Sequence, residues 1–231
     1  MKISRPASVI LSGLLLLLCA AVSTMAQQAE DYPANWCRNG LFPSDDAEFK
    51  LAKVGGNWTA RVHFFSDDDD CPTYTVKCET KRYLITGDEV VVSRKYGQWI
   101  CGWYQKGKGS ETVGWLLADK LVMPAAPAAP PVLKDWIGLW KYERASLTIR
   151  RDGKKNSLKV KGYAIWEGTG ANVHVGGVEA VAQPQGNELV LVEEECRVSL
   201  KLVGDYLVAK DNSECGGVNV RFNGVFRKAR R

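Results

Sequence analysis

The chain has 231 residues, seven cysteines, two histidines and a net charge of +5. Residues 27–125 carry a slight acidic excess and residues 126–231 a basic one, which suggests two units. Because both signs are mixed along each half, the charge pattern argues against nucleic-acid binding. His63 and His174 lie far apart and no C-x-x-C pair occurs, so the sequence also argues against zinc. We expect neither a metal nor a cofactor.

Residues 1–26 read as a secretory signal peptide. Lys2 and Arg5 precede an apolar run that ends in small residues, and we place the cleavage after Ala26. The run is too short to span a membrane, and nothing after it resembles a spanning helix. We therefore expect a soluble mature protein that is periplasmic or secreted in a bacterium. Cys19 offers an alternative, a lipidation site, but leucine precedes it where a small residue is required.

Removing the leader leaves six cysteines, an even number in an exported chain, which predicts disulfides. In the first half the preferred pairing closes one short loop and ties the N-terminal segment to the rest, although four cysteines also allow two other pairings. The last two cysteines are placed to bridge neighbouring strands. The preferred pairs are Cys37–Cys101, Cys71–Cys78 and Cys196–Cys215.

An alanine- and proline-rich stretch, "MPAAPAAPPVLKD" at residues 123–135, divides the mature chain. It separates a first unit, residues 27–122, from a second unit, residues 136–231, and each has a size suited to one small core. A stiff spacer is the favoured interpretation of this linker. Its prolines recur every third residue, so an alternative is that their common edge docks on an SH3-type groove of the same chain.

Hydrophobic residues in both units alternate with a period of two, which predicts strands. We therefore expect an all-β protein of two small barrels or sandwiches. The predicted strands lie at residues 89–93, 98–104, 146–151, 157–166, 188–194, 197–203, 206–210 and 218–228.

The first unit contains a succession of turns and strands that predicts a five-stranded small barrel, with Trp99 and Trp103 on one face. A Gly-Asp precedes its second strand, a Trp follows a short turn, and a Gly-Trp precedes the closing turn. From about residue 60 to 122 the sequence therefore resembles bacterial SH3-like (SH3b-type) domains of exported proteins. The residues that carry this resemblance are Gly87, Asp88, Trp99, Gly114 and Trp115.

The loop "HFFSDDDDCPTYTVKC" falls where such domains carry their ligand-facing loop. Its four aspartates would attract a basic or amine-bearing ligand beside aromatic side chains. The alternative is that the four aspartates form a solvated turn. Calcium binding is a further possibility, but the loop lacks the glycine and the distal glutamate of a dedicated calcium-binding loop. The predicted ligand-binding residues are Phe65, Asp67, Asp68, Asp69, Asp70, Tyr74 and Trp99.

The second unit begins with "DWIGLWKYE" and ends with "NVRFNGVFRK", so its first and last strands are expected to meet. Trp136, Gly138 and Trp140 form a W-x-G-x-W opening that resembles lipocalin-like barrels. The ending D-N-x-x-C-G-G-x-N-V-x-F-x-G resembles C-terminal domains of exported bacterial proteins, some of which accompany lysozyme-inhibitor-like domains.

No catalytic residue is predicted. Neither histidine has a Ser or Cys partner in a recognisable setting, and no G-x-S-x-G or H-E-x-x-H occurs. Glu193, Glu194 and Glu195 follow a strand, where a solvated turn is expected.

Three functions stay open. The leading one is a non-catalytic binding protein whose SH3-like domain recognises cell-wall (peptidoglycan) peptide or a periplasmic protein. The second is an inhibitor or immunity-type protein that acts on a cell-wall hydrolase such as basic lysozyme, with the acidic loop inserting. The third is a lipocalin-like carrier of an apolar ligand. We expect large side chains to fill the barrel, which argues against this function. The expected inner face is Leu147, Ile149, Leu158, Val160, Tyr163, Ile165, Leu189, Leu191, Val198, Leu200 and Leu202.

Overall fold

The computed structural model describes residues 33–44, 48–57, 59, 61–107, 109–124, 129–153 and 156–229. The expected signal peptide and Cys19 lie outside these residues. The protein is all-β, with 55% strand and 7% helix. Among the described residues, no helix is both long and apolar enough to cross a membrane.

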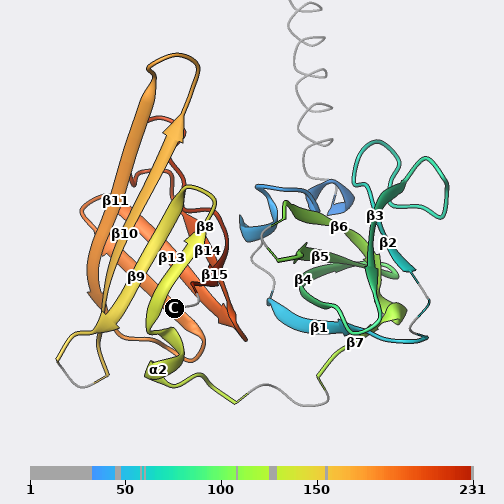
Figure 1. Cartoon of the computed structure of the whole chain (residues 1–231), viewed down its shortest axis with the longest axis horizontal. Coiled ribbons are helices and arrows are strands. Elements are labelled where there is room, and N and C mark those ends of the chain that lie inside the picture. Colours follow the sequence, from blue (N-terminus) through green and yellow to red (C-terminus); the bar gives the residue numbers. More distant parts are fainter. Residues whose placement is uncertain are drawn as a thin grey trace, which may run out of the picture.

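The strands before the linker form one antiparallel sheet of seven strands, curved into a half-barrel, in the order β3-β2-β6-β5-β4-β1-β7 (Figure 1). The sequence predicted five strands here. Short helical turns flank the sheet, η1 (Pro33–Trp36) and η2 (Phe42–Ser44) before it and η3 (Ala118–Lys120) near its end. The strands are β1 (Lys50–Val54), β2 (Arg61–Phe65), β3 (Glu79–Ile85), β4 (Glu89–Tyr96), β5 (Trp99–Gln105), β6 (Glu111–Leu117) and β7 (Leu121–Val122).

After a one-turn helix, α2 (Leu133–Trp136), eight antiparallel strands form a nearly closed barrel in the order β11-β10-β9-β8-β15-β14-β13-β12. The first and last strands pair, with Lys141 opposite Arg227, which confirms the expectation from the sequence. The strands are β8 (Gly138–Tyr142), β9 (Ala145–Arg151), β10 (Leu158–Glu167), β11 (Val173–Ala182), β12 (Glu188–Glu193), β13 (Cys196–Val203), β14 (Tyr206–Asp211) and β15 (Gly224–Lys228).

The gap between β11 and β12 is partly filled by the loop that contains the C-G-G sequence. Gly177 N donates to Cys215 O at 3.0 Å, and Gly176 forms an isolated bridge with Gly216. A Cβ atom on Gly176 would lie only 2.2 Å from Cys215 O, so this close approach requires glycine. The disulfide Cys196–Cys215 therefore joins the start of β13 to a loop. The sequence had placed both cysteines on neighbouring strands.

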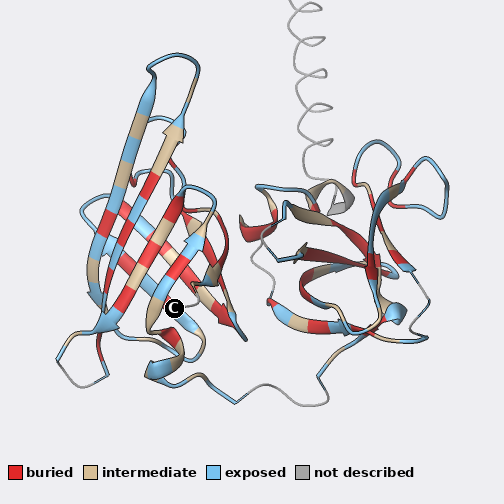
Figure 2. Cartoon of the chain, viewed as in Figure 1, coloured by how far each residue is buried: buried red, intermediate tan, exposed pale blue. Residues whose placement is uncertain are grey.

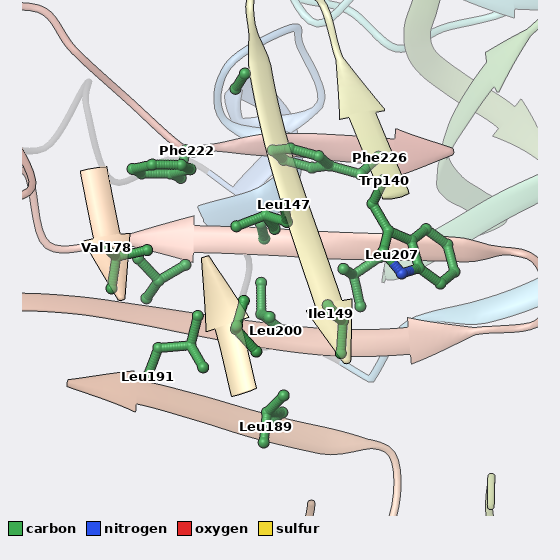
Figure 3. Close-up of a cluster of buried hydrophobic side chains, with 14 of the residues drawn as sticks. Trp140, Leu147, Ile149, Val178, Leu189, Leu191, Leu200, Leu207, Phe222 and Phe226 are labelled. Carbon is green, nitrogen blue, oxygen red and sulfur yellow. The ribbon is translucent and has the colours of Figure 1, made fainter. Parts of the chain in front are cut away.

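The barrel interior is filled by large apolar side chains from facing strands (Figure 3). On β10 the inward positions are Leu158, Val160, Gly162 and Ala164. Tyr163 points outward and is 48% exposed, so its predicted place in the core is wrong, and Ile165 is only partly buried. Glycine holds the inward position at 162 because a Cβ there would lie 2.8 Å from Val178 and 2.9 Å from Leu147.

Strand β5 is buried on both faces (Figure 2). One face, with Ile100, packs into the interior of the half-barrel. The other carries Trp99, Cys101 and Trp103, so the two tryptophans share a face as the alternation predicted. This second face is covered by the N-terminal segment, by the loop between β2 and β3 and by the barrel of the second unit.

The two units pack against each other, a point that the sequence left open. Val203, Val208 and Val225 of the barrel share a cluster with Trp103, and the rings of Trp103 and Tyr206 meet edge to face at 5.5 Å. Apolar burial therefore joins the units across the linker.

Polar contacts reinforce this interface. The Glu111 carboxylate accepts hydrogen bonds from Trp103 Nε1 at 2.8 Å and from Tyr142 Oη at 3.1 Å. Lys210 Nζ donates to Ser44 O at 3.1 Å. Pro124 and Pro130 of the linker are exposed, which favours the spacer interpretation, and Pro127 lies outside the described residues.

Candidate functional site

The strongest candidate site is the loop between β2 and β3, which projects from one end of the seven-stranded sheet (Figure 1). The disulfide Cys71–Cys78 closes it, as preferred from the sequence. Ser66 N donates to Cys78 O at 2.8 Å, and Cys71 N donates to Asp68 O at 3.0 Å. We call residues 66–78 the clamped loop, because a covalent bond and backbone hydrogen bonds both restrict it.

The three predicted aromatic residues come together beneath this loop. The ring of Trp99 lies 4.7 Å from that of Phe65 and 5.2 Å from that of Tyr74. Trp99 and Phe65 are almost fully buried, whereas Tyr74 is 63% exposed. Tyr74 therefore covers the other two rings, and a partner that approaches this surface meets Tyr74 first.

The position of Trp99 follows from strand pairing and a disulfide. Trp99 opens β5, opposite Tyr96 of β4 and Leu117 of β6. Two residues further on, Cys101 is bonded to Cys37, which holds the N-terminal segment against the same face. The rings therefore rest on a central strand rather than on a mobile loop.

The four aspartates divide into structural and exposed members. Asp67 is buried, and its Oδ2 lies 2.8 Å from Arg38 Nε, so it ties the clamped loop to the N-terminal segment. Burial raises the pKa of Asp67 above its ordinary value, and the hydrogen bond and charge of Arg38 oppose that rise. Asp67 is therefore unsuited to contact a ligand directly.

Asp68, Asp69 and Asp70 are exposed. Asp68 accepts a hydrogen bond from Ser66 Oγ at 2.8 Å, and Asp69 Oδ2 lies 3.1 Å from Lys77 Nζ. The hydrogen bond and charge of Asp69 raise the pKa of Lys77. Arg38 Nη2 also lies 3.6 Å from Asp68 Oδ1, so the loop presents an acidic side that Lys77 and Arg38 partly neutralise.

Sequence reasoning missed Val76, which is 94% exposed in the clamped loop. Val76 adds exposed apolar surface two residues from Tyr74, and tyrosine is enriched among the residues that dominate protein interfaces. The signal was present in the sequence, since Val76 is the only large aliphatic residue between the bonded cysteines Cys71 and Cys78.

Both histidines and Glu193, which were weighed as catalytic candidates, are engaged in local contacts. His63 Nδ1 lies 3.1 Å from Thr80 O, and His174 Nδ1 lies 2.6 Å from Val218 O. Glu193 Oε2 accepts a hydrogen bond from Glu179 N at 2.7 Å. In the described part of the chain, no three His, Cys, Asp or Glu side chains form a group able to hold a metal ion.

No family model, no curated protein and no solved structure matches the chain. The functional argument therefore depends on the geometry of the clamped loop and its surroundings.

Proposed function

We propose that this protein is a non-catalytic, exported binding protein that recognises a protein partner through the clamped loop. The observation that carries the proposal is a disulfide-closed loop whose Tyr74 and Val76 are 63% and 94% exposed. Restricting a loop before it binds reduces the entropy lost on association, and exposed aromatic residues supply contact area. Disulfides are typical of exported proteins, which supports a periplasmic or secreted location.

We further propose that the first unit is SH3-like and the second lipocalin-like in form. Gly87 adopts a positive φ of 89° in the turn before β4, and Asp88 Oδ2 accepts a hydrogen bond from Ile85 N at 2.9 Å. These features stabilise the Gly-Asp turn, which is one of the features that the sequence has in common with SH3-like domains. The filled interior of the barrel favours a structural role for the second unit over carriage of an apolar ligand.

A photo-crosslinking amino acid at position 76, introduced into the protein in cells, tests whether the clamped loop contacts a protein partner. We expect a discrete crosslinked product that Tyr74→Ala weakens. The same amino acid at Val218, which is 70% exposed on the second unit, is the matched control. Equal crosslinking from both positions would contradict the assignment of the clamped loop.

Cell-wall peptide is the other ligand that an SH3-like unit implies. Residues 27–231 are incubated with purified peptidoglycan sacculi and sedimented, beside Val76→Asp and Val218→Asp. Binding that only Val76→Asp abolishes would make wall peptide the ligand of this loop. Trp99→Ala is not a suitable variant, because Trp99 is buried and its loss would disturb the fold.

A second candidate function is inhibition of a basic cell-wall hydrolase. The exposed carboxylates Asp68, Asp69 and Asp70 favour it, because acidic groups attract a cationic cleft. Lysozyme activity is measured with the same protein preparation. Inhibition that Asp70→Asn weakens, without sedimentation on sacculi, would favour this candidate, and unchanged lysozyme activity would exclude lysozyme as the target.

A further inference from the structure

A cleft of about 280 Å³ lies between the two units, and none of its lining residues belongs to the clamped loop. One wall comes from the N-terminal segment around η2, which lies between the units (Figure 1). The other wall is the outer face of the barrel at β12, β13 and β14. The residues that matter here are Pro43, Phe49, Val190, Lys201, Val208 and Lys210.

The walls of this inter-unit cleft are largely apolar. Phe49 is buried and packs against Phe42 with ring centroids 5.3 Å apart. Val208 is buried on the opposite side, whereas Val190 is 40% exposed at the edge. Small-molecule sites commonly combine apolar walls with a few polar groups and lie between domains. An occupant of this cleft therefore has an apolar part.

The polar groups of the cleft favour an anion. Lys201 Nζ lies 5.6 Å from the centre of the Phe49 ring and 3.4 Å from Glu188 Oε1, and its side chain is 26% exposed. Lys210 Nζ donates to Ser44 O on the other wall. The lining residues therefore hold two ammonium groups and one carboxylate, a net positive charge beside apolar surface.

We propose that the inter-unit cleft binds a small carboxylate with a short apolar tail. The carboxylate contacts Lys201, and the tail lies against Phe49, Val190 and Val208. The cleft volume of about 280 Å³ lies just below the range of roughly 300–1,000 Å³ of small-molecule sites, so only a short tail fits. This inference is independent of the clamped loop, so either can fail without the other.

The test uses isotope-labelled residues 27–231 titrated with hexanoate and followed by NMR. We expect saturable shifts of the Phe49, Val190 and Lys201 amides. Hexan-1-ol has the same tail without the charge, and hexylamine carries the opposite charge, so both should bind more weakly. Hexanoate shifts that do not saturate, or an equal response to hexylamine, would overturn the proposal.

Two variants separate the site from the fold. Lys201→Gln should weaken hexanoate binding about tenfold, because it removes a charged partner. Lys159→Gln is the matched control, since Lys159 also pairs with a glutamate on a neighbouring strand, 2.7 Å from Glu179 Oε1, but lies outside the cleft. Val190→Trp should fill the cleft from its exposed edge and abolish binding with an unchanged fold. Wild-type affinity in both cleft variants would contradict the site.

Discussion

Strand β10 of the barrel and strand β5 of the half-barrel obtain their burial in different ways. Along β10 buried and exposed residues alternate, whereas the first five residues of β5 are all buried. A strand with one buried face needs only its own barrel to form a core, but a strand buried on both faces needs a second layer. The comparison indicates that the barrel is self-sufficient and that the half-barrel depends on other parts of the chain.

Three parts of the chain supply this second layer over β5. The N-terminal segment is attached through Cys37–Cys101, the clamped loop places Tyr74 over Trp99, and the barrel contributes Tyr206 and three valines. Each part can be removed separately, so the dependence of the half-barrel is open to direct measurement.

Separating the units should have the largest effect. Residues 129–231 alone should keep a cooperative unfolding transition, because the barrel core comes from its own strands. Residues 33–124 alone lose the valines and Tyr206 that cover Trp103, so we expect a red-shifted tryptophan emission and a lower Tm. Urea unfolding followed by fluorescence compares the two fragments with the full chain. Equal stability of both fragments would contradict the proposed dependence.

Loss of the disulfide Cys37–Cys101, which closes the longer loop, should have the next largest effect on stability. Replacing both Cys37 and Cys101 by Ala releases a loop with a sequence separation of 64 residues, which should lower the free energy of unfolding by about 4 kcal/mol. The same change at Cys71 and Cys78, separated by 7 residues, should lower it by about 2.5 kcal/mol. Chemical denaturation measures both. The reverse order would mean that loop length does not determine the relative contributions of the two disulfides.

Glu111→Ala should have a smaller effect. The change leaves Trp103 Nε1 and Tyr142 Oη without their acceptor at the interface between the units. We expect the free energy of unfolding to fall by about 1–3 kcal/mol. Glu195→Ala, on an exposed turn of the barrel, is the control and should change it by less than about 0.5 kcal/mol. Equal effects of the two changes would mean that Glu111 does not support the interface.

The smallest expected effect is a loss of stability at alkaline pH. Burial, with the hydrogen bond and charge of Asp88, raises the pKa of Tyr104 to about 12, and burial also raises the pKa of Tyr206 and Tyr142. An unfolded tyrosine ionises near pH 10, so the folded state binds these protons more tightly. Stability is therefore complete below about pH 10 and falls as the pH rises toward 12.

Urea unfolding at a series of pH values from 9 upward measures this fall. Tyr206→Phe removes one of these ionisations from the interface and should reduce the slope. An unchanged slope in Tyr206→Phe would remove Tyr206 from the explanation.

Part of the candidate site was predictable because the residues of the loop between Cys71 and Cys78 are close in sequence. The association of Trp99, on a different strand, with Phe65 and Tyr74 was expected from the resemblance to SH3-like domains. The clamped loop and its closing disulfide followed from local pattern and spacing. The burial of Asp67 did not, because it depends on Arg38, which is 29 residues away. Four consecutive aspartates give no indication in the sequence of which one is buried.

The sequence by itself determined the all-β class, the strands near 157–166 and 188–210, the meeting of the first and last barrel strands, and a favoured disulfide pairing. Alternation and cysteine count are local properties, and they determine which face of a strand is apolar. Only the tertiary structure decided what covers that face. It packed the barrel against Trp103, turned Tyr163 outward and brought Gly216 against Gly176 at the gap in the barrel, because burial depends on surfaces that meet from distant parts of the chain.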